Sequence, residues 1–270
     1  MKKLNFLMIA AAMTIGLVSC SKEDNAGSPV VDNTDVKGNL IIKEFNVGGG
    51  FKTTEGKSYG WCKAIVLYNN SSKPITATNL AIGTIPPGNA HANNGNYDKD
   101  GKLVYENADW LPMTYAIWYI PSITVAPFSD AVVAINGAID HTAVAPEAFN
   151  LADASYYAMY DPESSYVNPN AYPAPYEGIP TANYWKAAVF GLGNAWAISV
   201  MCPNFVLFQF PVGVDPKTYC ADKANVYYDG GKETAANYCV KIKKSWVIDG
   251  VETYRSTMLD LSVKRLTADI

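Results

Sequence analysis

Cys20 is the residue whose surroundings specify a chemistry most clearly. Two lysines stand near the start of the chain, an apolar run covers residues 4–18, and the sequence Leu-Val-Ser-Cys ends at position 20. A basic start, a short apolar run and small residues before a cleavage point are typical of a secretory signal peptide. A cysteine at the first mature position predicts a lipoprotein, in which the Cys20 sulfur carries a diacylglyceryl thioether and the freed amine takes a third chain.

Two alternatives for this segment are a plain signal peptide with a chance cysteine and a short transmembrane helix. The apolar run is shorter than the roughly 20 residues that a helix needs to cross a bilayer. Two or more acyl chains give stable membrane anchoring. We therefore expect residues 1–19 to be a lipoprotein signal peptide and residues 20–38, which are polar and contain Gly, Pro, Asn and Asp, to be a flexible lipidated tether.

The four cysteines that follow Cys20 are even in number, which outside the cytoplasm suggests disulfides. Cys220 and Cys239 each follow a tyrosine and flank a stretch with Gly and Asn, so we pair them with each other and pair Cys62 with Cys202. The alternative is four buried free thiols. A zinc site is not expected, because the chain has no CxxC motif and the spacings fit no zinc template.

Residues 96–101 (NYDKDG) are the best metal candidate in the chain. Asn96, Asp98 and Asp100 place side-chain oxygens at the first, third and fifth positions of a calcium loop, with glycine at the sixth. The twelfth position holds Asn107 instead of glutamate, and the flanks look extended instead of helical. A tight Asp-Gly hairpin turn is therefore the favoured interpretation, and calcium is the alternative.

Residues for hydrolytic chemistry are scarce. The chain has two histidines, His91 and His141, both in polar sequence, and no GxSxG motif for a nucleophilic serine. Asp161 and Glu163 are the carboxylate pair that we single out as a candidate for glycoside hydrolysis. No phosphate-binding GxxxxGK[ST] run is present either. The sequence predicts that the protein is not an enzyme and has no cofactor.

The stretch of residues 155–185 is rich in tyrosine and proline and is the best binding candidate. Tyrosine and tryptophan are enriched where surfaces bind, because they offer a flat ring with a polar tip. A sugar, a tetrapyrrole or a partner protein would suit such rings. The alternative is that the rings pack a Pro-rich crossover onto the domain. The candidate ligand-binding residues are Tyr160, Tyr166, Tyr172, Tyr176 and Trp185.

Charge and composition limit the partners. The net charge of −4 becomes −6 once residues 1–19 are removed, since they contain two lysines and no acidic residue. A nucleic-acid partner would need a basic surface, so none is expected. Nearly half of the residues are hydrophobic and 12% are aromatic, which suits a packed domain over residues 39–270.

The elements that must position these residues are mostly strands. Short β-branched and aromatic runs alternate with turn-forming residues, which predicts a two-sheet sandwich with little helix. Pro121 is expected to end one strand, residues 146–154 could hold a short helix, and residues 192–200 could be helix or strand. Residues 84–113 and 155–185 read as long irregular loops. The expected strands are residues 40–47, 61–68, 80–83, 116–120, 131–135, 205–210, 238–242 and 245–248.

Several segments resemble known families. Ser-Lys-Glu-Asp at 21–24 resembles the Bacteroidetes lipoprotein export signal, which implies the outer face of the outer membrane; an ordinary solvated tether is the alternative. Residues 61–83 and 123–135 resemble the lamin-tail type of immunoglobulin-like sandwich. The span of about 38–270 resembles domain-of-unknown-function family 4876, through AINGAIDHT at 134–142, KAAVFGLGNAWAISV at 186–200, KKSWVIDGVE at 243–252 and SVKRL at 262–266.

The resemblance to family 4876 implies an extracytoplasmic Bacteroidetes lipoprotein, often linked to TonB-dependent uptake receptors, with no established catalytic residues. The chain departs from the family at its end, because a further strand or hairpin is expected after residue 270; we expect either a truncated form or an open sheet edge. The function hypothesis is an outer-membrane, cell-surface lipoprotein that acts as a non-catalytic binding or accessory protein. A structural or adhesive surface protein and, less favoured, a surface hydrolase are the alternatives.

Overall fold

The computed structural model describes residues 36–87, 96–114, 116–163, 173–189, 202–234, 237–254 and 263–270. All of them belong to one compact unit over residues 32–270. The prediction of a mostly β chain with little helix is confirmed. Among the described residues the largest sheet has nine strands, in the order β1 (Leu40–Asn46), β4 (Ala64–Asn69), β8 (Asp130–Ala134), β9 (Tyr157–Met159), β10 (Tyr184–Ala187), β7 (Trp118–Val125), β5 (Ile75–Gly83), β11 (Asn204–Gln209) and β14 (Val247–Glu252).

The remaining elements are small. A three-stranded sheet has the order β12 (Val226–Tyr228), β13 (Tyr238–Lys243) and β6 (Trp110–Thr114), and a hairpin joins β2 (Phe51–Lys52) and β3 (Ser58–Tyr59). The described α-helix is α1 (Pro216–Ala221), and single 3-10 turns are η2 (His141–Ala143), η3 (Thr181–Asn183), η4 (Lys223–Asn225), η5 (Asp229–Gly231) and η7 (Lys244–Trp246).

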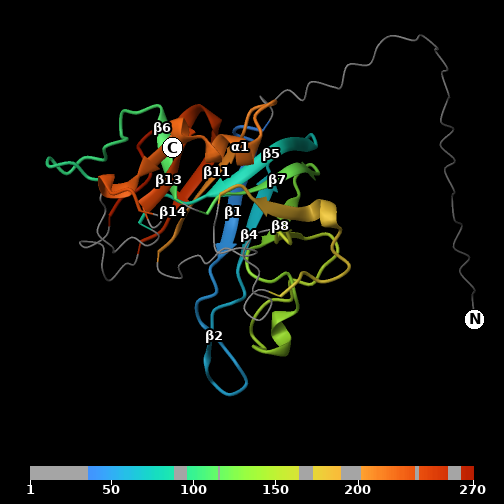
Figure 1. Cartoon of the computed structure of the whole chain (residues 1–270). Helices are drawn as coiled ribbons and strands as arrows, with labels where there is room; N and C mark the ends of the chain where they lie inside the picture. The colour runs from blue at the N-terminus through green and yellow to red at the C-terminus, as the bar shows by residue number, and fades with distance from the viewer. Residues whose placement is uncertain are drawn as a thin grey trace, which may run out of the picture. The chain divides into compact units, whose positions relative to one another are not determined.

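The nine-stranded sheet curls until its two end strands meet, so that it is nearly barrel-shaped (Figure 1). β1 and β14 contact each other. The backbone N–H of Ile42 in β1 donates to Oδ2 of Asp249 in β14 over 2.7 Å. A side chain thus satisfies a donor that an open edge strand would leave unpaired.

The inner face of this sheet holds the central apolar core. Residues that alternate along its strands point inward, among them Ile65 and Leu67 of β4 and Phe205 and Leu207 of β11, all without solvent exposure. The intervening residues of β11, Val206 and Phe208, belong to a second cluster on the outer face, which the three-stranded sheet and α1 cover. Burial on both faces explains why residues 205–208 are apolar without a break.

A third apolar cluster lies on the outer face of β4 and β8. Ala64 of β4 and Ala134 of β8 pack there against Ala138, Ala148 and Leu151 from the segment that follows β8. Its members are mostly small, so the segment that covers this face approaches it closely. This segment covers only part of the outer face and leaves a pocket beside it, over β1, β4 and β8.

Several local predictions differ from the structure. β7 continues through Pro121, where the sequence predicted its end. Proline has no N–H to donate, and it is tolerated because the ladder between β7 and β5 skips this position: Ile120 pairs with Leu80 and Ser122 with Thr78. Asn79, which lies between these two partners, has φ of +52°. Residues 146–154 form turns and no helix. The predicted loop at 84–113 contains the start of β6, and residues 192–200 lie outside the described residues.

The helix α1 was not predicted, although its signals are local. Asp215 caps it by accepting from the N–H of Thr218 over 2.8 Å, and Pro216 occupies its first position. At six residues it was too short to show an apolar period. Within the part of the chain that the structure describes, no helix has the length and apolar character to cross a membrane.

Candidate functional site

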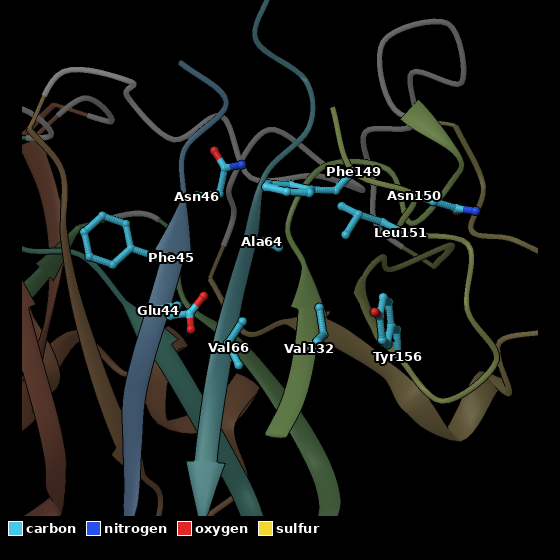
Figure 2. A pocket seen from close by; sticks show the side chains of 10 residues that line it. All are labelled: Glu44, Phe45, Asn46, Ala64, Val66, Val132, Phe149, Asn150, Leu151 and Tyr156. Atoms are coloured by element: carbon cyan, nitrogen blue, oxygen red, sulfur yellow. The ribbon is translucent and has the colours of Figure 1, made fainter. Parts of the chain in front are cut away.

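The candidate site is a pocket on the outer face of β1, β4 and β8, and strand register builds its floor. Glu44 of β1 faces Val66 of β4, which in turn faces Val132 of β8. In the neighbouring row Asn46 faces Ala64. Side chains two apart on a strand share a face, so these residues line one surface. Figure 2 shows Glu44, Val66 and Val132 in a row across the three strands.

A β-bulge in β1 decides that Glu44 belongs to this surface. The register of β1 against β4 shifts between Ile42 and Glu44, so that Lys43 is an extra residue. Ile42 packs against the inner core, and simple alternation would also direct Glu44 inward. The extra residue turns Glu44 outward and Phe45 inward, where its ring lies 5.3 Å from that of Phe205. The bulge therefore places a carboxylate beside an apolar floor.

The wall of the pocket comes from the segment after β8. Phe149, Leu151 and Tyr156 stand above and beside the floor (Figure 2). The segment is held by the N–H of Leu151, which donates to Ile139 O over 3.0 Å. The ring of Phe149, half exposed, meets Phe51 of β2 edge to face at 5.6 Å. The pocket encloses about 420 Å³, within the size range of small-molecule sites.

The polar groups of the pocket are partly committed and partly available. Oδ1 of Asn46 accepts from the N–H of Gly48, and Oδ1 of Asn150 accepts from the N–H of Ala152, each over 2.8 Å. Among the described residues, the Nδ2 groups of both asparagines and the carboxylate of Glu44 form no hydrogen bond. The described lining includes no Lys, Arg or His. The polar side chains of the lining are thus two amides, one carboxylate and the Tyr156 hydroxyl, around an apolar surface.

His141 supports the segment behind the pocket wall and is buried. Its Nε2 lies 2.8 Å from Gly137 O, which only accepts, so Nε2 carries the proton. Nδ1 then accepts from the hydroxyl of Tyr59 over 2.7 Å. Burial lowers the pKa of His141, which keeps the imidazole neutral. The arrangement is structural; His91 lies outside the described residues.

The predicted aromatic binding residues do not gather into one site. Trp185 is fully buried in the inner core, so its assignment to a binding surface is wrong. Tyr160 packs edge to face on Tyr184 at 5.7 Å, and Tyr176 is 43% exposed. Crossover packing, the alternative weighed from sequence, describes Tyr160 and Trp185. Two further predicted residues, Tyr166 and Tyr172, lie outside the described residues.

The calcium candidate is a hairpin turn, as favoured from the sequence. One carboxylate oxygen of Asp98 accepts from the N–H groups of Asp100 and Lys102, each over 2.9 Å. Residues on either side of the turn form an antiparallel bridge. Asn96 is buried, and its Oδ1 accepts from the Tyr227 hydroxyl over 2.8 Å. Side-chain oxygens of Asp98 and Asn96 therefore serve the turn and its anchor, and the Asp100 carboxylate pairs with Lys99 at 2.9 Å.

Neither predicted disulfide is formed in the structure, in which Cys62, Cys220 and Cys239 are buried free thiols. Cys220 packs with Val240 on one face of β13, whereas Cys239, the preceding residue of that strand, points to the other face. Cys62 lies in the cluster outside β4 and β8, to which Cys202 does not belong. Burial raises the pKa of the Cys220 thiol to about 12, so it stays protonated.

Asp161 is buried but serves the backbone. Its carboxylate accepts from the N–H of Glu163 over 3.0 Å and from that of Ala187 over 3.2 Å, and Nζ of Lys217 lies 3.7 Å away. The predicted pair with Glu163 is therefore a turn contact and not two facing carboxylates. Within the described ranges no three His, Cys, Asp or Glu side chains form a group that could hold a metal.

A fully buried arginine near the end of the described chain was missed from the sequence. The guanidinium of Arg265 donates to Glu252 over 3.2 Å, to Pro87 O over 3.1 Å and to Cys202 O over 2.9 Å. Tyr105 donates its hydroxyl to Arg265 O over 2.7 Å. Lys-Arg in a short terminal run looks solvent-exposed, and no local signal distinguishes it. This cluster ties distant segments of the chain together.

The fold and site define the class of protein as a mostly β domain with a pocket on the outer face of its largest sheet. The family model described as "Protein of unknown function (DUF4876)" matches residues 126–270, just over half of the chain, and the chain belongs to this family. The family resemblance predicted from the sequence is thereby confirmed. The pocket wall and β8 lie within the matched residues, while β1 and β4 precede them.

One solved structure is similar in fold, a crystal structure of a DUF4876 family protein from Bacteroides thetaiotaomicron. The TM-score is 0.65 at 19% sequence identity, and the match covers 85% of this chain and 57% of that chain. This chain therefore corresponds to little more than half of its structural neighbour. Comparison with curated proteins found no match.

Proposed function

We propose that this chain is an outer-membrane lipoprotein that faces the cell exterior and captures a small ligand without chemical change to it, as an accessory to a TonB-linked uptake system. The pocket beside Glu44 is the observation that carries the proposal. It combines an apolar floor with a few polar side chains in its lining, as small-molecule sites do. The signal sequence and Cys20 support the location, and the uptake link rests on the family resemblance.

The finer fold assignment, an immunoglobulin-like sandwich of the lamin-tail type, is part of the same proposal. The segments that carry that resemblance correspond to β4, β5 and β8. β4 pairs with β8, and β5 pairs with β7 across the core. Antiparallel pairing on two sides of one core is what a sandwich requires.

The anchoring part of the proposal is tested in cells. We expect the wild-type protein to fractionate with the outer membrane and to be cut by protease added to intact cells. Cys20→Ala should appear in soluble fractions, because the acceptor of the lipid is gone. A Cys202→Ala variant is the matched control and should stay anchored. Anchoring that survives Cys20→Ala would contradict the proposal.

The binding part is tested by a chemically broad screen on the mature chain, with saccharides, amino acids, peptides and tetrapyrroles as probes and thermal shift as readout. Val66→Phe adds a ring that fills the floor, and it should remove binding without unfolding the protein, because Val66 is only half-buried. Val212→Phe adds the same ring at a position that is 67% exposed and should change nothing. No binding by the wild type, or binding that Val66→Phe leaves intact, would contradict the proposed site.

The uptake part is tested by crosslinking in intact cells followed by capture of the anchored protein. Recovery of a TonB-dependent receptor is the expected result. Capture of host or matrix proteins in its place would favour the adhesive alternative.

A further inference from the structure

We infer that the pocket takes an uncharged polyhydroxylated ring, a saccharide unit, and that Glu44 is its specificity-determining residue. This inference rests on the proposed binding function and names the chemistry of its ligand. Three properties of the pocket lead to it: the flat apolar floor, the complementary hydrogen-bonding groups and the sign of the charge.

The floor suits the face of a ring. Ala64, Val66 and Val132 are small or β-branched and carry no polar side-chain atom. The row from Glu44 to Val132 crosses two strand spacings, which is about 10 Å. Phe149 stands at the edge with half of its surface exposed. An aromatic ring of this kind packs against C–H groups while the ligand keeps its hydroxyls at its rim.

The polar groups then select hydroxyls. An ionised carboxylate only accepts hydrogen bonds, and an amide Nδ2 only donates them. Glu44 offers the acceptor, and Asn46 and Asn150 offer donors, since the Oδ1 atoms of both asparagines already accept from the backbone. A vicinal diol donates and accepts at neighbouring atoms, so it can meet both kinds of group. A purely cationic ligand would leave the amide donors without acceptors.

The charge of the pocket excludes acidic ligands. The described lining contains no cation; Lys43, which is not part of the lining, pairs with Asp130 at 3.0 Å and also attracts Glu44 electrostatically. An anion in the pocket would meet the Glu44 carboxylate and no cation of the lining. A neutral hexose should therefore bind better than the corresponding uronate, and the difference should depend on Glu44.

The experiment measures affinities by isothermal titration calorimetry with the mature chain. The probes are uncharged methyl hexopyranosides and their disaccharides, the matching uronates, benzyltrimethylammonium and cyclohexylmethanol. We expect a neutral saccharide to bind and its uronate to bind at least ten-fold more weakly. Glu44→Gln should weaken the neutral saccharide about ten- to hundred-fold, as loss of a hydrogen bond to a charged group does, and should bring the two affinities together.

The matched control is Glu55→Gln, which removes an exposed carboxylate of the β2–β3 hairpin that pairs with Lys57. It should leave both affinities unchanged. Binding of benzyltrimethylammonium or cyclohexylmethanol that Val66→Phe abolishes, without saccharide binding, would overturn the saccharide inference and leave the proposed function standing. Saccharide binding that is indifferent to Glu44→Gln would overturn the role of Glu44. No binding of any probe here or in the broad screen would overturn both.

Discussion

Glu44 and Glu252 are glutamates on the two strands that close the nine-stranded sheet, β1 and β14, and their surroundings are opposite. The carboxylate of Glu252 is nearly buried, pairs with the buried Arg265 and accepts from the backbone N–H groups of Arg265 and Leu266. The carboxylate of Glu44 is exposed and has no hydrogen-bond partner among the described residues. The Glu252 carboxylate is bound by groups of the protein itself, whereas the Glu44 carboxylate is available to a ligand.

The difference between the two glutamates shows how a charge that stabilises the fold can be distinguished from a charge that binds a ligand. Removal of one partner of a buried ion pair strongly destabilises the fold, because the other charge stays buried without compensation. An exposed carboxylate beside an apolar floor contributes little to stability, so its removal affects binding instead. Four variants test these expectations. They follow in order of the expected change in the free energy of unfolding, from the largest to the smallest.

Arg265→Ala should have the largest effect. It leaves the Glu252 carboxylate buried without its counter-charge, and the carbonyls of Pro87 and Cys202 lose a donor. We expect a loss of about 3–5 kcal/mol in the free energy of unfolding, measured by urea denaturation. Lys264→Ala, an exposed side chain one residue earlier, is the control and should stay within about 0.5 kcal/mol. If both variants lost an equal and small free energy of unfolding, the buried pair of Glu252 and Arg265 would be no more structural than Glu44.

Asp249→Ala tests the seam between β1 and β14. The variant leaves the N–H of Ile42 without its acceptor at 2.7 Å, next to the bulge that directs Glu44. We expect a loss of about 1–3 kcal/mol and faster hydrogen exchange of the Ile42 amide. Asp249→Asn keeps an acceptor oxygen and should recover most of the loss. An unchanged exchange rate in Asp249→Ala would show that the seam does not depend on this side chain.

His141 should make stability fall in acid. Its pKa is lowered in the folded state from the ordinary value of 6.5, so the unfolded chain binds more protons as the pH falls. Stability should be full above pH 6.5 and decrease below it, by at most about 1.4 kcal/mol per pH unit for one proton. His141→Gln should remove this slope, measured by urea denaturation between pH 7.5 and 5. His91→Gln is the control and should keep it; the reverse pattern would contradict the assignment.

Glu44→Gln should have the smallest effect on stability, within about 0.5 kcal/mol, because the carboxylate is exposed and accepts no hydrogen bond within the described structure. Thermal unfolding of the variant beside Glu252→Gln checks this. Glu252→Gln should lower stability clearly, since it removes the charge that faces Arg265. A Glu44→Gln variant as unstable as Glu252→Gln would mean that both glutamates are structural.

Much of the fold was predictable because local patterns carry it. The strands β1, β4, β8, β11 and β13 lie close to the apolar runs expected for them, and the Asp-Gly turn forms as the short-range chemistry of Asp98 requires. The site was not predictable. The tyrosine-rich stretch drew attention by composition, whereas the pocket is built from Ala, Val and Phe residues that read as ordinary core.

By itself the sequence determined a mostly β chain of this family, with apolar runs that need cover on both faces. Only the tertiary structure decided which residues of those runs face the pocket. A single extra residue, Lys43, reverses the face of Glu44. Arg265 is buried beside Glu252, 13 positions earlier. Cys220 of α1 packs on one face of β13, while Cys239 of β13 points to the opposite face. Local propensity depends on neighbours in the chain, but strand register and the pairing of charges and thiols depend on contacts between distant segments.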